Sequence, residues 1–283
     1  MAVVDLERLI DSESQIASMP AIVPRINKAV DDPRSSMDAV GKIITEDPAL
    51  SARLLKLANS AFYTSPFPVK TISRALTMIG TKQLKELVTA IFTVKMCDKY
   101  AGKQINMDAF WRHSIACGVA ARVIATAKRL INTERFYLAG LLHDVGHLII
   151  FTKLLQHTEK LAAQSREGKI PVYKLERELL GFDHAEVGGK LLKTWQLPPE
   201  LVIPVMNHHT PSKADDFQLE TAIIHVAEVI ASSMLYGSAM EPHVPPFDKA
   251  AWEIIGTPLN TLPTIIEQVQ IQFEDAVKIF APK

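Results

Sequence analysis

Apolar residues recur along most of the chain at the three- and four-residue spacing of one helix face. In DPALSARLLKLANSAF, Pro48 stands in a first-turn position directly after Asp47, a residue type that caps helix N-termini well. The apolar positions that follow at helical spacing are Leu50, Leu54, Leu57 and Ala58. This stretch therefore predicts an amphipathic helix with a clear start.

The same spacing continues through TISRALTMIGTKQLKELVTAIFTVKM, where Gly80 and Thr81 divide the segment into two helices. A long, alanine-rich helix is expected from Asp108 to Leu130. Further helices are predicted at residues 133–145, 153–167, 171–180, 184–194, 198–208, 217–235 and 260–279. Because no run shows the β-branched alternation of a strand, the sequence predicts an all-α fold.

Two breaks suggest how the chain is organised. KYAGKQ, near residue 100, separates an N-terminal helical block (about 12–100) from the part that carries most of the histidines (about 101–235). The connection is short, so we expect these two parts to depend on each other. The proline-rich stretch MEPHVPPF leads into a C-terminal helical appendage, 236–283.

Composition narrows the class of protein. The 283 residues are 48% hydrophobic and 22% charged, as in a globular protein with a large core, and the 31 basic residues balance 31 acidic ones. This balance gives no reason to expect nucleic acid or an anionic membrane as a partner. Cys97 and Cys117 lie on apolar helical patterns, which favours two reduced core thiols. Asp5 and Glu7 do not suit a secretory signal, and no apolar run approaches the ~20 residues of a membrane span, so we expect a cytoplasmic protein.

The stretch GLLHDVGHL, residues 140–148, places His143 and Asp144 inside an apolar segment predicted to be one helix. An ionised Asp144 is costly there unless it has a partner. Other candidate ligands lie on four further predicted helices or at their ends: His113, His184, His208 with His209, and Glu228. Imidazole and carboxylate together suit iron, zinc, manganese or nickel, and helical folds build metal sites from several facing helices. Asp144, with two oxygens, is suited to bridging two ions.

A polar network that fills a gap in the core is the alternative. Taken singly, a buried histidine more often donates to a backbone carbonyl than binds a metal, and we favour that interpretation for His147, His157 and His225. His209 raises a separate question, because neighbouring residues on a helix point about 100° apart. Both His208 and His209 can face one ion only if the helix ends there, as Thr210-Pro211 indicates.

These residues carry a family resemblance. The order H…HD…H…HH…(D/E) is similar to that of the HD superfamily of metal-dependent phosphohydrolases, and HAEVGGKLLKTWQLP resembles the HxxxGxxLLxxWxLP segment of its HD-GYP branch. SMPAIVPRI, EDPALSARLLKLANSAFY and TISRALTMIGTKQLKELV resemble the HDOD domain, a bacterial signalling relative of HD-GYP. The resemblance covers about residues 12–235 and implies an HD-superfamily helical bundle preceded by an HDOD block.

The resemblance also implies a ligand set for two divalent ions. His113, His143, Asp144 and Glu228 would surround one ion, and Asp144, His184, His208 and His209 the other. In an active enzyme, His143 and Asp144 would be catalytic. Three departures from the HD-GYP pattern stand out: Glu228 replaces an aspartate, His147 replaces a lysine, and HHTPSKADDF lacks the DGxGYP loop associated with cyclic di-GMP hydrolysis.

Two functions remain open. The HDOD-type N-terminal half and the three departures favour a regulatory module that acts on a signalling protein partner and retains a divalent metal site. The complete ligand row favours a metal-dependent phosphohydrolase acting on a phosphorylated small molecule, with Arg112 or Lys190 steadying the substrate phosphate. LANSAFYTSPFPVKT adds a further choice, because Phe62, Tyr63 and Phe67 suit either core packing or a partner surface.

Overall fold

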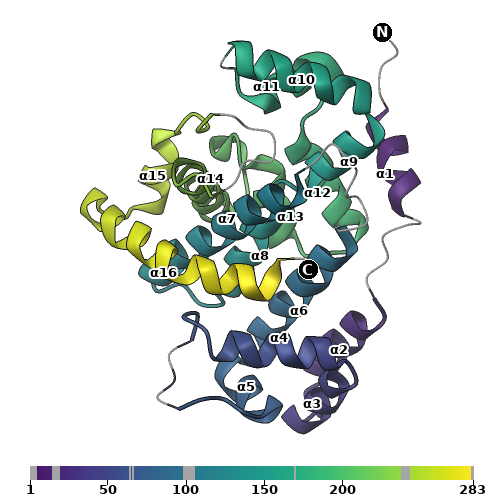
Figure 1. Ribbon diagram of the computed structural model, residues 1–283, viewed down its shortest axis with the longest axis vertical. Coiled ribbons are helices and arrows are strands. Elements are labelled where there is room, and N and C mark those ends of the chain that lie inside the picture. The colour runs from purple at the N-terminus through teal and green to yellow at the C-terminus, as the bar shows by residue number, and fades with distance from the viewer. Residues whose placement is uncertain are drawn as a thin grey trace.

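The computed structural model describes residues 5–14, 20–63, 65, 67–97, 106–168, 170–236 and 243–281, and every regular element in these ranges is a helix (Figure 1). The all-α prediction is thus confirmed. In chain order the α-helices are α1 (Leu6–Ser14), α2 (Ile22–Asp31), α3 (Met37–Thr45), α4 (Pro48–Ala58), α5 (Ile72–Ile79), α6 (Thr81–Cys97), α7 (Met107–Ala127), α8 (Glu134–Leu142), α9 (Val145–Lys153), α10 (Leu155–Gly168), α11 (Val172–Leu180), α12 (His184–Thr194), α13 (Pro199–Asn207), α14 (Gln218–Ser233), α15 (Lys249–Ile255) and α16 (Leu262–Phe280). Two 3-10 turns are η2 (Pro211–Lys213) and η3 (Leu259–Thr261).

Helix α7 lies at the centre of the fold and packs against α8, α14 and α16. Helix α12 packs against α9 and α13, and α13 in turn contacts α8 and α14. Helices α2 to α6 form the N-terminal block, seen at the bottom of Figure 1, and α6 joins this block to α8. Helices α7, α8, α9, α12, α13 and α14 therefore converge on one region, and the predicted metal ligands come from these helices and their ends.

Local sequence signals set several helix ends. The Asp47 carboxylate accepts hydrogen bonds from the backbone N–H groups of Ala49 (2.9 Å) and Leu50 (3.0 Å), and Pro48 occupies the first turn of α4, as predicted. The predicted break at Gly80 is also confirmed, because Gly80 ends α5 with a φ of 87°, a value that favours glycine.

One predicted element is wrong. Residues 133–145 do not form a single helix: α8 ends at Leu142 and α9 begins at Val145, so His143 and Asp144 lie between two helices. Asp144 leaves the helical conformation, with φ −98° and ψ 5°. The chain can therefore follow α7 along α8 and then turn so that α9 packs on α12. Periodicity alone does not reveal such a break, because both helices are apolar.

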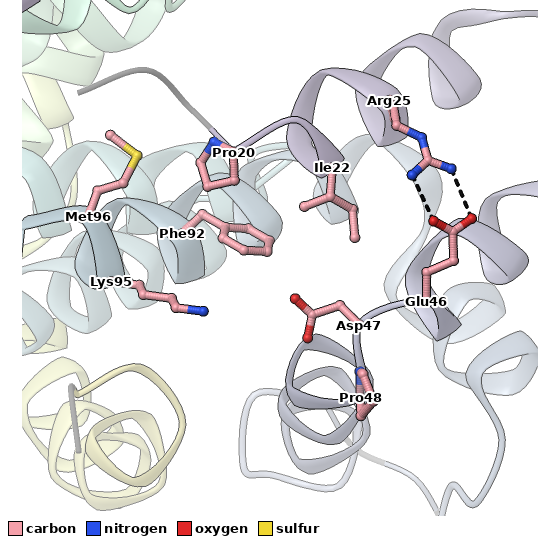
Figure 2. Close-up of a pocket in the computed structure, with 9 residues that line it drawn as sticks. All are labelled: Pro20, Ile22, Arg25, Glu46, Asp47, Pro48, Phe92, Lys95 and Met96. Atoms are coloured by element: carbon pink, nitrogen blue, oxygen red, sulfur yellow. Dashed lines mark hydrogen bonds and ion pairs between the residues drawn. The ribbon is translucent and has the colours of Figure 1, made fainter. Parts of the chain in front are cut away.

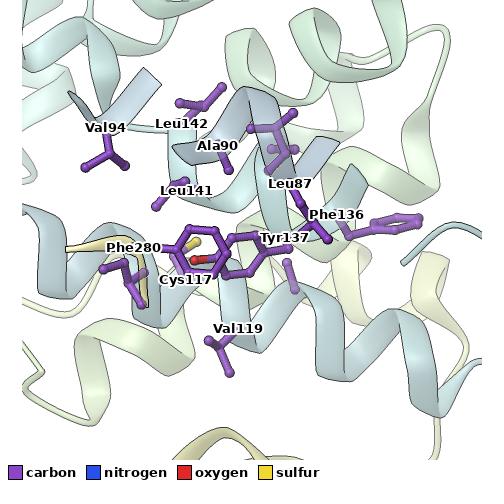
Figure 3. Packing of buried hydrophobic residues seen from close by; sticks show 14 of the residues in the cluster. Leu87, Ala90, Val94, Cys117, Val119, Phe136, Tyr137, Leu141, Leu142 and Phe280 are labelled. Atoms are coloured by element: carbon purple, nitrogen blue, oxygen red, sulfur yellow. The ribbon is translucent and has the colours of Figure 1, made fainter. Parts of the chain in front are cut away.

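Apolar side chains connect the N-terminal block to the rest of the core: Figure 3 shows Leu87, Ala90 and Val94 of α6 in one cluster with Tyr137 and Phe280. The ring of Phe62 contacts Tyr137 of α8 edge-on at 5.5 Å between centroids, and Tyr137 lies 4.8 Å from Phe280 of α16. Phe62 is buried, whereas Phe67 is 69% exposed, so the aromatic stretch after α4 divides between core and surface. Cys97 and Cys117 are buried and form no disulfide.

Helix α16, in the predicted C-terminal appendage, packs against α4, α6 and α7. The division predicted near residue 100 falls at residues 98–105, outside the described residues, and remains a prediction. Among the helices described, none alone has the length and apolar character needed to cross a membrane; one pair, 134–153 with 156–165, passes together by length and composition but is bent by 112°.

A buried polar network ties three parts of the chain together. The Arg122 guanidinium on α7 donates to the Phe62 carbonyl oxygen (2.8 Å) and to Gln272 Oε1 on α16 (3.1 Å). It also contacts Glu134 Oε1 at 3.4 Å, and the same carboxylate oxygen accepts a 2.7 Å hydrogen bond from the Tyr63 hydroxyl. Arg122 and Glu134 are 7% and 2% exposed, so each charge depends on the other.

Replacing Arg122 with methionine should lower the free energy of unfolding by about 3–5 kcal/mol, because the Glu134 charge would stay buried without its cation. Urea unfolding of the two proteins measures the difference. The double variant Arg122→Met/Glu134→Gln should recover part of this loss. If single and double variants unfold alike, the buried charge is not the cause.

Close backbone contact between α9 and α12 depends on a glycine. A Cβ atom added at Gly146 would lie 2.0 Å from the His184 carbonyl oxygen and 2.7 Å from the Gly188 nitrogen. Because both neighbours are backbone atoms, they cannot move aside without shifting a helix. Gly146 thus allows α9 to reach the start of α12, where His184 begins the helix.

Gly146→Ala should therefore destabilise the protein by about 1–3 kcal/mol or more, since α9 and α12 must separate. Thermal and urea unfolding measure the effect. Gly41→Ala is the matched control: it lies within α3, and the nearest atom to its added Cβ is 3.7 Å away. Gly41→Ala should be neutral or slightly stabilising. Equal effects of the two substitutions would contradict the role of close packing at Gly146.

Candidate metal centre

The structure brings all seven predicted ligands into one buried cluster. His113 comes from α7, His143 and Asp144 from the α8–α9 junction, and Glu228 from α14. The remaining three come from the start of α12 and the end of α13. Side chains of all seven are at most 9% exposed: His113, His143, Asp144, His184, His208, His209 and Glu228. The cluster contains four groups of three residues, and within each group the potential ligand atoms lie within 4.8 Å of one another. Each of the seven residues belongs to at least one group.

The end of α13 lets two neighbouring histidines face the cluster. The helix stops at Asn207, and the Thr210 N–H donates to the Asn207 carbonyl oxygen at 2.8 Å. The rings of His208 and His209 lie 3.9 Å apart, and His209 Nε2 is 2.8 Å from His184 Nε2. The prediction that the helix ends at this pair is confirmed.

Contacts at Nδ1 fix the ring orientation of three imidazoles in the cluster. His143 Nδ1 contacts the Gly140 carbonyl oxygen at 2.7 Å, and His208 Nδ1 contacts the Val205 carbonyl oxygen at 2.7 Å. His184 Nδ1 lies 2.6 Å from Glu176 Oε2. A proton on each Nδ1 satisfies these acceptors and leaves the Nε2 lone pair directed into the cluster.

The Nε2 atoms of His143 and His208 are buried and have no hydrogen-bond partner. Buried polar atoms are rarely left so, unless a water or an ion completes them. Neutral imidazole nitrogens beside a carboxylate are the donor set of borderline divalent metals. The residues present therefore fit a divalent metal.

Asp144 lies between the two sides of the cluster. Its Oδ2 is 3.3 Å from His143 Nε2 and 3.7 Å from His113 Nε2, while its Oδ1 is 3.3 Å from His184 Nε2. Each oxygen thus faces a different set of imidazoles, as a bridging carboxylate would. Glu228 lies on the far side, where its Oε2 is 3.7 Å from His209 Nδ1.

The electrostatics favour the metal-binding protonation state of most, but not all, of the ligands. Burial lowers the pKa of His143 to about 4, and burial together with neighbouring imidazoles lowers the pKa of His208 and His209 well below the usual value. Burial alone would raise the pKa of Asp144, but the neighbouring His143 and His184 outweigh it and hold this pKa well below its usual range. Neutral His143, His208 and His209 therefore lie beside an ionised Asp144 at neutral pH. His184 differs: burial lowers its pKa, but Glu176 and Asp144 outweigh burial and hold this pKa well above the usual value, so a metal ion would have to displace a proton from His184.

The sequence analysis missed Glu176 of α11, which is fully buried. Its Oε2 accepts the His184 backbone N–H at 2.9 Å in addition to the contact with the His184 ring. Burial opposes ionisation, but His184 and His147 lower the pKa of Glu176 to about 2. A signal was present, because Glu176 falls midway between Val172 and Leu180 on the apolar face of its helix.

Of the other histidines, one lies beside the cluster and one is a structural histidine bonded to the backbone. We expected His147 to donate to a backbone carbonyl. Its ring nitrogens face the carboxylates of Glu176 and Asp144 instead. For His225 the structural interpretation is confirmed: its Nδ1 contacts the His208 carbonyl oxygen at 2.8 Å, and its Nε2 accepts the Asp248 N–H at 2.9 Å.

The two cations suggested as phosphate contacts have partners elsewhere. Arg112 lies 3.6 Å from Glu274 of α16 and over the ring of Phe273. Lys190 lies 3.5 Å from Glu7 of α1. A role for either of them in binding phosphate remains a prediction.

A separate pocket of about 640 Å³ lies in the N-terminal block, between α2, the α3–α4 junction and α6 (Figure 2). Phe92 and Ile22 form part of its apolar wall. Arg25 at its edge is paired with Glu46 by two hydrogen bonds of 2.7 and 2.8 Å, and Asp47 also lines it. Two acidic side chains, Glu46 and Asp47, and two basic ones, Arg25 and Lys95, line the pocket, so it has no excess of positive charge for a phosphate.

The chain is similar in sequence and in fold to known proteins. An uncharacterized protein from Treponema pallidum (strain Nichols) is 26% identical over 201 residues, which are 70% of this chain and 38% of that relative. The chain thus spans well under half the length of this curated relative.

Two solved structures are similar over nearly the whole chain. An HDOD domain protein of unknown function from Geobacter sulfurreducens is 24% identical, with a TM-score of 0.75 and coverage of 97% of this chain and 98% of that chain. A candidate metal-dependent phosphohydrolase from Shewanella amazonensis SB2B is 23% identical, with a TM-score of 0.64 and coverage of 97% and 96%. These likenesses establish the fold. The family model described as the HDOD domain matches residues 16–211, more than half of the sequence, and the chain belongs to the HDOD domain family.

Proposed function

We propose that this protein is a bacterial signal-transduction module that retains a divalent metal site and acts on a signalling protein partner in the cytoplasm. Two ions, of iron, manganese, zinc or nickel, would be held by the seven ligands, with Asp144 between them. Their main role would be to hold the helix ends together.

The burial of the ligand cluster is the observation that carries this proposal. Both His143 and His208 are 0% exposed, and Asp144 is only 6% exposed. A catalytic metal site keeps an open coordination position that substrate can reach, whereas structural sites are closed. A closed cluster therefore favours a structural or regulatory metal over one that turns over phosphoesters.

Residues around the cluster also favour regulation. His147 stands where the HD-GYP pattern has a lysine, and its Nδ1 lies 3.2 Å from Glu176, so this side chain faces a buried carboxylate in place of a substrate phosphate. After the histidine pair, the chain enters the short turn η2, Pro211–Lys213, in place of a DGxGYP loop. Arg112 and Lys190 have acidic partners on α16 and α1.

The second candidate is a metal-dependent phosphohydrolase, which the complete ligand row favours. A bound pair of divalent ions would supply a water activated as a nucleophile. Asp144 would hold both ions, and His143, fixed by its contact with Gly140, would orient one of them. The candidate phosphohydrolase from Shewanella amazonensis SB2B shares the fold.

Elemental analysis tests the metal site. Protein purified without a metal-affinity tag should contain about two equivalents of divalent metal, and the double variant His143→Ala/Asp144→Ala should contain little. His157→Phe is the control, because this half-buried histidine of α10 lies outside the cluster. Unchanged metal content in the double variant would overturn the ligand assignment.

A second experiment separates the two functions. The metal-loaded protein should hydrolyse a panel of phosphomonoesters, phosphodiesters and nucleotides no faster than the His143→Ala/Asp144→Ala variant. Effects on the signalling partner should survive the same double substitution, provided that the variant still folds by circular dichroism. Metal-dependent hydrolysis that the double variant lacks would replace the regulatory proposal with the enzymatic one.

A further inference from the structure

His147 and His184 form a stacked pair beside the predicted ligands. Their rings are 3.7 Å apart between centroids and 23° from parallel. Glu176 spans one edge of the stack: its Oε2 lies 2.6 Å from His184 Nδ1, and its Oε1 lies 3.2 Å from His147 Nδ1. A single buried carboxylate thus faces the same nitrogen of both rings.

The opposite edge of the stack faces Asp144. Asp144 Oδ1 is 3.3 Å from His184 Nε2 and 3.9 Å from His147 Nε2. His147 therefore repeats the arrangement of His184, with one nitrogen toward Glu176 and the other toward Asp144. Because His184 belongs to the predicted ligand set and His147 does not, this repetition requires an explanation.

Hydrogen bonding does not account for the side of the stack that faces Asp144. The 3.9 Å separation between His147 Nε2 and Asp144 Oδ1 is too long for a hydrogen bond, and the His147 side chain is only 3% exposed. A metal ion would fill such a gap, because two donors on one ion, each bonded at about 2.0–2.2 Å, lie at most about 4.3 Å apart. The donor atoms of Asp144, His147 and His184 all lie within 4.8 Å of one another.

We propose that His147 is a further metal ligand, which binds together with Asp144 and His184, and that Glu176 is the positioning residue for both imidazoles. This inference rests on the proposed metal centre and adds an eighth ligand to it. A carboxylate that accepts the remote N–H of a ligating histidine fixes its ring and raises its basicity. Glu176 is 0% exposed and faces two such rings, so one side chain would orient both.

The substitution of histidine for lysine at position 147 then has a direct chemical meaning. A lysine there would offer a cation to a substrate phosphate, whereas the imidazole offers another donor to the ion. An ion with one more protein ligand has one fewer position for water or substrate. His147 thus favours a filled coordination shell, in agreement with a regulatory role.

Zn²⁺ binding by the full-length protein, measured by competition with a chelator, tests the proposal. His147→Phe keeps an aromatic ring stacked between His184 and Phe151 but removes both nitrogens. One of the two ions should bind at least about tenfold more weakly in this variant, and Glu176→Gln should weaken binding by about 10–100-fold. His157→Phe, a half-buried histidine on α10 outside the cluster, should bind like the wild type. Wild-type affinity in His147→Phe overturns the proposal.

Anomalous scattering from crystals of the wild-type protein soaked in Zn²⁺ does not depend on whether a variant folds. An ion at bonding distance from His147 Nε2 supports the proposal; an ion bound to Asp144 and His184 with His147 beyond about 3 Å refutes it. Wild-type protein that binds no metal defeats the metal centre as a whole. Two ions bound without His147 defeat only the present inference.

Discussion

A buried carboxylate must be compensated by its neighbours, and the arrangement of the central helices meets this requirement at Asp144. The carboxylate is 6% exposed and is faced by the Nε2 atoms of His113, His143 and His184 at 3.3–3.7 Å. No single helix supplies such a shell. The break between α8 and α9, the start of α12 and the end of α13 all bring side chains to this one group, so helix ends rather than helix faces build most of the site.

Sequence reasoning succeeded where the signal was local. Asp47 and Pro48 marked a helix start, and Thr210-Pro211 marked a helix end, because capping and proline chemistry act within a few residues. The order of the ligands along the chain predicted that they cluster, because it resembles the order in a known family. The spacing between them along the chain carries no such information.

It failed where the signal was non-local. The break at His143 was hidden because the apolar residues on both sides are buried in either arrangement, and periodicity cannot distinguish one buried helix from two. Glu176 was missed, and His147 was expected to contact a backbone carbonyl, because the position of each side chain depends on the other and on His184. A charged residue on an apolar helix face was the one clue, and it identified a buried carboxylate without naming its partner.

The contacts of α16 show that the packed core extends beyond the part of the sequence that the family model matches. The family match ends at residue 211, yet Phe280 packs on Tyr137 and Gln272 accepts a hydrogen bond from Arg122. A fragment cut at the end of the match would expose an aromatic ring and lose one acceptor of a buried guanidinium. The core of the matched region therefore includes side chains of α16, a helix that lies beyond the end of the match.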